Sequence, residues 1–119
     1  DLVIISMSQL VQKKWSVGRE YAEMGQKVYP AEAKAYNLSG FAKIQMKDFE
    51  GALEEFSSYD KKLPGNPNIT FFKGYAYEGM EKYPQAGQEY QRYLQVTQEG
   101  DYARHAYQRL REWQARGYI

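Results

Sequence analysis

The chain has 119 residues, a length that fits one domain with a hydrophobic core of its own. Sixteen basic and fifteen acidic side chains leave a formal net charge of +1, which gives no electrostatic reason to expect nucleic acid or an anionic membrane as the main partner. Cysteine is absent, which excludes disulfides, thiolate metal sites and cysteine nucleophiles. The mean hydropathy is −0.78 and the longest aliphatic run covers only residues 2–5, so we expect no membrane insertion.

The feature that organises the sequence is an internal repeat of 34 residues, and a missed repeat would misassign the whole fold. One offset aligns large aromatic side chains, small residues and prolines along the chain. The aligned sets are Trp15, Phe49 and Tyr83; Ala22, Phe56 and Tyr90; Gly40 and Gly74; and Pro30 and Pro64. The offset predicts a single domain over residues 1–119, made of repeats 1–32, 33–66 and 67–100 and a terminal segment.

Each repeat is predicted to contain two helices, because apolar residues recur at helical spacing on both sides of a short turn. In the second repeat these helices are expected over residues 33–46 and 49–63. Asn66 is typical of an N-cap and Pro67 of the first residue of the helix that follows. We expect no strand in the chain.

The terminal segment is predicted to form one more amphipathic helix. Gly100 indicates a stop and Asp101 an N-cap, after which apolar residues keep helical spacing over residues 102–114. A capping helix is therefore expected within residues 101–115.

With this period and these residues, the chain resembles the tetratricopeptide-repeat (TPR) family over essentially its whole length. The residues that carry the resemblance are Tyr36, Gly40, Ala52, Phe56 and Pro64 in the second repeat, and Gly74, Tyr77, Ala86 and Tyr90 in the third. Ser39, Lys43, Lys73 and Gln98 depart from the family pattern. The resemblance implies an all-α chain, an α-solenoid of three TPR helical hairpins plus a C-terminal capping helix.

The resemblance also implies a concave groove lined by the first helix of each repeat, which would bind a protein or peptide segment through apolar and aromatic anchors. The implied groove residues are Met7, Leu10, Lys34, Asn37, Phe41, Ile44, Asn68, Phe71, Tyr75, Glu78, Tyr102, His105 and Arg109. A second interpretation stays open, in which these residues are core and the terminal helix folds over Phe71 and Tyr75. Most of the twelve tyrosines, with Tyr107 among them, are expected to pack helix on helix.

One activity of the family is excluded by the residues at the relevant places. TPR co-chaperones that hold the acidic C-terminus of heat-shock chaperones use Lys, Asn and Arg to clamp two carboxylates. At the matching positions this chain has Val3, Met7, Leu38, Asn68 and Phe72. We therefore expect a more apolar ligand than such a tail.

Catalysis within the chain is not expected. His105 is the only histidine, and one imidazole without convergent ligands is a poor metal site, so we expect no metal and no cofactor. No His-Glu-x-x-His, Gly-x-Ser-x-Gly or phosphate-binding glycine loop is present. The terminal helix carries several arginines, Arg104, Arg109, Arg111 and Arg116, for which a solvated capping face and an anionic partner are the two interpretations.

Two alternative functions stay open. The stretch 106–113 and the ending 117–119 are similar to the C-terminal tails of bacterial zinc metalloproteases that carry TPR units, which would make the chain a substrate-positioning region. Residues 90–107 also resemble envelope-assembly TPR proteins of Gram-negative bacteria, and both resemblances favour a periplasmic over a cytoplasmic location. The first residue is Asp1, so we expect a processed protein or a piece of a longer one. The other alternative is a homodimer that associates through Leu2 to Ile5 and Leu10-Val11.

Overall fold

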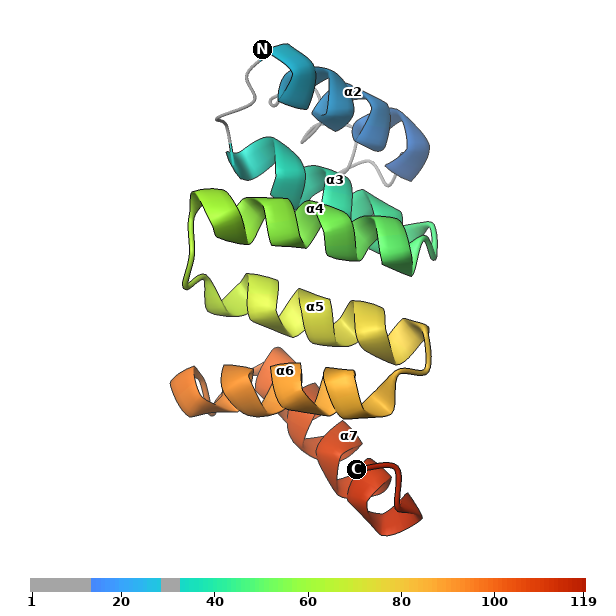
Figure 1. Cartoon of the computed structure of the whole chain (residues 1–119), viewed down its shortest axis with the longest axis vertical. Helices are drawn as coiled ribbons and strands as arrows, with labels where there is room; N and C mark the ends of the chain where they lie inside the picture. The colour runs from blue at the N-terminus through green and yellow to red at the C-terminus, as the bar shows by residue number, and fades with distance from the viewer. Residues whose placement is uncertain (1–13, 29–32) are drawn as a thin grey trace. The chain divides into compact units, whose positions relative to one another are not determined.

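The structure, a computed structural model, describes residues 14–28 and 33–119, and within these ranges it contains six α-helices and no strand (Figure 1). The helices are α2 (Trp15–Val28), α3 (Ala33–Gln45), α4 (Phe49–Lys62), α5 (Pro67–Gly79), α6 (Tyr83–Val96) and α7 (Asp101–Arg116). The predicted all-α fold class is confirmed. Of the helices described, none combines the length and the apolar character required to cross a bilayer.

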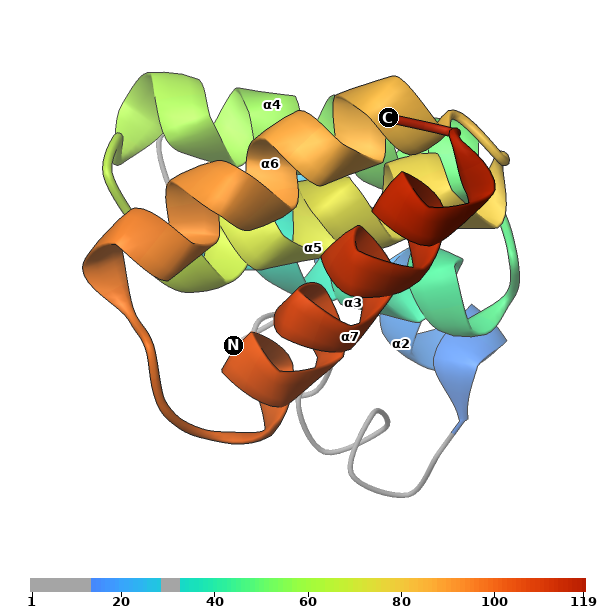
Figure 2. The ribbon, with the colours of Figure 1, turned by 90° about the horizontal axis from the view of Figure 1, so that it is seen from below.

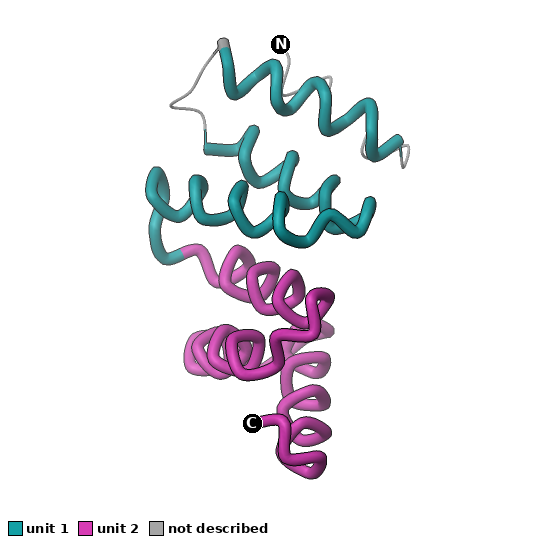
Figure 3. Tube along the Cα trace, turned by 45° about the vertical axis from the view of Figure 1, so that its right-hand side comes forward, with its two compact units in different colours: residues 1–65 teal, residues 66–119 magenta. Residues whose placement is uncertain are grey.

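The chain divides into two compact units, residues 1–65 and 66–119, which we call unit 1 and unit 2 (Figure 3). Unit 1 contains α2, α3 and α4, and unit 2 contains α5, α6 and α7. The boundaries of the three sequence repeats and the single domain remain predictions.

Unit 1 is built around the α3–α4 hairpin, and a glycine allows its two helices to approach closely. A Cβ atom on Gly40 would lie 2.5 Å from Cε1 of Phe56, whose ring is fully buried. Helix α2 packs on α3, where the ring of Trp15 meets Phe41 edge-on at 5.8 Å between centroids. The turn between α3 and α4 places Lys47 at a φ of 63°, in the left-handed region.

A group of polar and charged side chains joins the helices α2, α3 and α4 of unit 1. Lys43 on α3 contacts Glu55 on α4 at 2.9 Å and Glu23 on α2 at 3.4 Å. Gln26 donates to the second Glu55 oxygen at 2.7 Å. Burial alone would lower the pKa of the Lys43 ammonium, but the two glutamates outweigh burial and raise that pKa. Lys43, a departure from the TPR pattern, therefore has a structural role of its own.

Unit 2 repeats the hairpin in α5 and α6. A Cβ atom on Gly74 would lie 2.6 Å from Cε1 of the fully buried Tyr90. The predicted N-cap is confirmed, since the side chain of Asn66 accepts a hydrogen bond from the backbone N–H of Asn68 at 3.0 Å and Pro67 begins the helix. The turn between the helices again uses a left-handed residue, Glu81, at a φ of 58°.

Helix α7 lies against the hairpin of unit 2, as Figure 2 shows from the side of this helix. Its small residues Ala103 and Ala106 are fully buried and Trp113, at 3% exposure, stacks on Tyr90 at 5.8 Å. The expected N-cap is wrong by one residue: Gly100 is the cap and makes no side-chain bond, because Asp101 is already helical.

The end of α7 turns back onto the hairpin. Gly117 adopts a left-handed φ of 76°, which ends the helix. The ring of Tyr118 then stacks on Tyr83 at 4.7 Å between centroids. The last residues of the chain therefore belong to the packing of unit 2.

Candidate functional site

The predicted groove residues fall into three sets. Met7 and Leu10 lie outside the described residues. In unit 1, α3 carries Lys34, which is exposed, Asn37 and Phe41, which are half-buried, and Ile44, which is buried. The third set belongs to unit 2 and comes from two helices: Asn68, Phe71, Tyr75 and Glu78 on α5, and Tyr102, His105 and Arg109 on α7.

An aromatic cluster joins α5 to α7 in unit 2. The ring of Phe71 stacks on Tyr102 at 4.4 Å between centroids and 13° between planes. His105 meets Phe71 edge-on at 5.7 Å and lies 5.7 Å from Tyr75. Stacked and edge-on aromatic pairs of this kind contribute about 1 kcal/mol each beyond the area that they bury. The cluster therefore fixes α7 on α5.

The members of the cluster differ in exposure. Phe71 is only 3% exposed, so the terminal helix covers it and its ring belongs to the core. Tyr75 and Tyr102 keep 38% and 40% of their surface in solvent. We use the name α5–α7 face for the surface formed by Asn68, Tyr75, Tyr102 and His105, which presents two tyrosine rings on a buried aromatic support.

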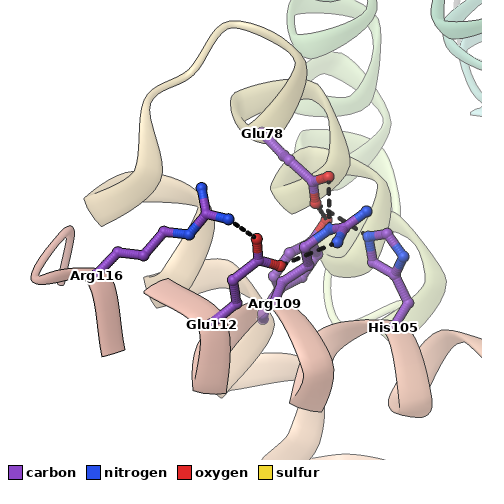
Figure 4. A network of polar contacts seen from close by, with 6 residues as sticks. Glu78, His105, Arg109, Glu112 and Arg116 are labelled. Atoms are coloured by element: carbon purple, nitrogen blue, oxygen red, sulfur yellow. Dashed lines mark hydrogen bonds and ion pairs between the residues drawn. The ribbon is translucent and has the colours of Figure 1, made fainter. Parts of the chain in front are cut away.

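Beside this face, Glu78 of α5 is the centre of a polar network (Figure 4). Its Oε1 atom accepts a hydrogen bond from the Tyr90 hydroxyl at 2.7 Å and lies 3.0 Å from Nε2 of His105. Its Oε2 atom accepts from Nε of Arg109 at 3.0 Å. Arg109 also reaches Glu112 at 3.4 Å, and Glu112 pairs with Arg116 at 3.0 Å.

The network determines the protonation of Glu78. Burial alone would raise the pKa of this carboxyl, but hydrogen bonds from His105 and Tyr90 and the positive charge nearby outweigh burial and lower the pKa. Burial and the adjacent carboxylate raise the pKa of the Tyr90 hydroxyl, which stays a donor. Burial would lower the pKa of Arg109, and Glu78 reverses that effect and raises it. Glu78 is therefore an ionised acceptor whose two oxygens are both engaged.

We expect unit 2 to lose stability on acidification through Glu78. Because its folded pKa lies below the ordinary value of 4.5, the unfolded chain takes up the proton first, and stability falls as the pH drops from about 4.5 through the folded pKa. Urea unfolding of the wild type and of Glu78→Gln between pH 3 and 6 measures this. The slope of stability against pH in that window should be smaller in the variant, and equal slopes would contradict the assignment.

Part of the site was missed by the sequence reasoning. The Tyr90 hydroxyl was expected only to fill space between helices, whereas it donates to Glu78. The ion pairs of Glu112 with Arg109 and Arg116 were not expected, although the 34-residue offset aligns Glu112 with Glu78 and so offered a signal. Over residues 14–28 and 33–119, no three histidine or acidic side chains converge in a way that could hold a metal ion.

No protein-family model matches the chain, and the comparison with curated proteins gives no match. Solved structures do match. The Arabidopsis OM64 TPR domain superposes with a TM-score of 0.86 at 19% identity, over 93% of this chain and 92% of that one. The first TPR of Spaghetti (RPAP3), bound to the HSP90 peptide SRMEEVD, gives 0.86 at 16% identity, over 99% and 91%. A MamA D159K mutant gives 0.81 at 14% identity, over 98% of this chain and 66% of that one.

These likenesses show the fold. The chain has the fold of TPR helical hairpins, as the repeat of 34 residues predicted. The two hairpins that the structure describes in full, α3–α4 and α5–α6, have their close contact at Gly40 and Gly74.

Proposed function

We propose that this chain, with its TPR fold, is a protein–protein interaction module that binds a partner peptide or helix without catalysis of its own. The observation that carries the proposal is the α5–α7 face. Tyr75 and Tyr102 come from different helices, and the buried Phe71 ring contacts both of them. Such a preformed surface lowers the entropy that binding costs. A peptide-bound TPR domain among the similar structures supports the same class of function.

The chemistry of the α5–α7 face favours apolar and aromatic anchors in the partner. Tyrosine rings offer large contact areas, with hydroxyls that can take polar contacts at the edge. The carboxylate of Glu78 is neutralised by Arg109 and so offers little free charge next to the face. At the clamp positions, Leu38 and Phe72 are half-buried and apolar, and Asn68 is exposed. An acidic peptide such as SRMEEVD, to which the similar RPAP3 domain is bound, is therefore not the ligand that we propose.

The test combines peptide selection with a double substitution on the face. Peptides selected by display on the wild-type chain should be enriched in aromatic and large aliphatic residues. Tyr75→Ala with Tyr102→Ala should weaken the selected peptides at least tenfold, because both exposed rings of the face are removed. Fluorescence anisotropy with labelled peptides measures the affinity. Removing the Tyr102 ring also uncovers Phe71, so we expect a stability loss of about 1 kcal/mol, and binding is compared well below the melting temperature.

Tyr118→Ala is the matched control, because Tyr118 has similar exposure, 42%, and also loses one stacked aromatic pair, with Tyr83, but lies outside the α5–α7 face. It should keep the affinity within twofold. If the double variant binds as tightly as the wild type, the α5–α7 face is not the binding surface. Phe71→Ala would be less informative, since that ring is core.

In unit 1, Lys34, Asn37 and Phe41 on α3 are proposed as binding residues of that unit by itself. The alternative roles, a substrate-positioning region of a bacterial zinc metalloprotease and a homodimer, stay predictions. The segment expected to mediate self-association lies outside the described residues. Sedimentation at several concentrations tests the homodimer, and a monomer at every concentration would contradict it.

A further inference from the structure

The outward side of α7 corresponds to a surface that is covered in both hairpins. The 34-residue offset aligns α7 with α3 and α5, so that Gln108 takes the place of Gly40 and Gly74. In the hairpins the second helix covers this place, through Phe56 on Gly40 and Tyr90 on Gly74. On α7 the aligned positions are all exposed: Arg104, Tyr107, Gln108 and Arg111. We call these four residues the outer face of α7.

The outer face is open to solvent. Its four residues and Glu112, all on α7, line a shallow surface depression of about 590 Å³. Tyr107, which was expected from the sequence to pack between helices, is 45% exposed in this depression. The buried residues of α7, Ala103, Ala106 and Trp113, are not among those that line it. The face is therefore available in unit 2 as the structure describes it.

The charge of the outer face is positive. Arg109 and Arg116 are engaged by Glu78 and Glu112, so they do not contribute free charge. Arg111 has no ion pair within residues 14–28 and 33–119. Arg104 pairs only with Asp101, in a contact so exposed that solvent screens it strongly. Glu112 is already neutralised by two arginines.

We propose that the outer face of α7 docks an acidic amphipathic helix of a partner protein, in the place that α4 and α6 take in the hairpins. Arg104 and Arg111 are seven residues apart, about 10 Å along one side of the helix, which matches carboxylates two turns apart on the docked helix. Tyr107 lies between them and offers its ring to an apolar side chain. The proposal concerns a second surface and does not rest on the α5–α7 face.

Gln108 determines which kind of helix fits. In the hairpins glycine allows an aromatic ring of the second helix to touch the backbone of the first. The Gln108 side chain fills that space, so a helix that presents a large ring there would clash. A helix with a small residue opposite Gln108 and glutamates on either side is accommodated, and the complementary charge sets its register.

The test uses a synthetic helical peptide of Ala, Leu and Glu, with glutamates seven residues apart, and the same peptide with Lys in place of Glu. The Glu peptide should bind in fluorescence anisotropy titrations and shift the amide resonances of residues 104–112. The double variant Arg104→Glu with Arg111→Glu should have at least tenfold lower affinity for the Glu peptide and should bind the Lys peptide instead. Thermal melting establishes that each variant is folded.

A matched control separates this face from net charge. Lys82→Glu with Arg92→Glu changes the charge of unit 2 by the same amount at other exposed positions, and it should keep the affinity for the Glu peptide within twofold. Equal weakening by both double variants would overturn the proposal, as would amide shifts that map to Tyr75 and Tyr102. If the wild-type chain dimerises and Arg104→Glu with Arg111→Glu abolishes the dimer, the outer face binds a second copy of the chain, and the proposal is also overturned.

Discussion

Gly74→Ala should destabilise unit 2 by about 2 kcal/mol, although alanine is the better helix former. The added Cβ atom would lie 2.6 Å and 2.7 Å from two ring carbons of Tyr90. That ring cannot move away easily, because it is fully buried and its hydroxyl is bound to Glu78. Urea unfolding in a Trp15→Phe background, followed by the fluorescence of Trp113, measures the loss.

Gly87→Ala is the control for this prediction, since Gly87 is also a buried glycine inside a helix of unit 2. Its added Cβ atom would lie 3.4 Å from a methyl carbon of Ile119, an ordinary contact. We expect this variant to gain about 0.5–1 kcal/mol from the lower entropy of the unfolded chain. If Gly74→Ala is as stable as Gly87→Ala, the contact of Gly74 with Tyr90 does not require a glycine, and the prediction is wrong.

Glu78→Leu should cost unit 2 about 3 kcal/mol. A leucine side chain has roughly the size of glutamate but leaves the Tyr90 hydroxyl and His105 without their acceptor. Arg109 loses the nearer of its two carboxylate partners, at 3.0 Å, and keeps only Glu112 at 3.4 Å. Removing one partner of a part-buried charged network is costly because the groups that remain are only partly solvated. Breaking a fully buried ion pair costs about 3–5 kcal/mol, and we expect the lower value here because the Glu78 side chain is 20% exposed.

Glu99→Leu provides the comparison for Glu78→Leu, as Glu99 is an exposed glutamate of the same unit. Its substitution should change the free energy of unfolding by less than about 0.5 kcal/mol. A loss in Glu78→Leu no larger than in Glu99→Leu would show that the network contributes nothing to stability. Chemical denaturation at pH 7 compares the two, with the wild type as reference.

The hairpins could be predicted because their determinants recur in the sequence. Gly40 and Gly74 mark the close contacts, and Phe56 and Tyr90 are the rings that fill them. Each pair is set by local spacing and needs no knowledge of distant packing. The 34-residue period was therefore sufficient to predict the fold class and which helices pair into hairpins.

The path of α7 could not be predicted in the same way. Phe71 occupies a groove position in the repeat, but it is buried because α7 places Tyr102 and His105 on it. Tyr107 was expected to pack and is exposed, since no second helix of the described residues covers it. The 34-residue period specifies which side of a helix faces the other helix of its hairpin. It does not specify how a helix such as α7 packs, because no second helix of the described residues pairs with it.

The two tryptophans of the sequence divide between the two compact units. Trp15 lies edge-on to Phe41 in unit 1, and Trp113 stacks on Tyr90 in unit 2. Replacing either one by phenylalanine leaves a single indole whose emission reports the unfolding of one unit alone. Coincident transitions from the two single-tryptophan chains would mean that the units unfold cooperatively, and separated transitions would give each unit its own free energy.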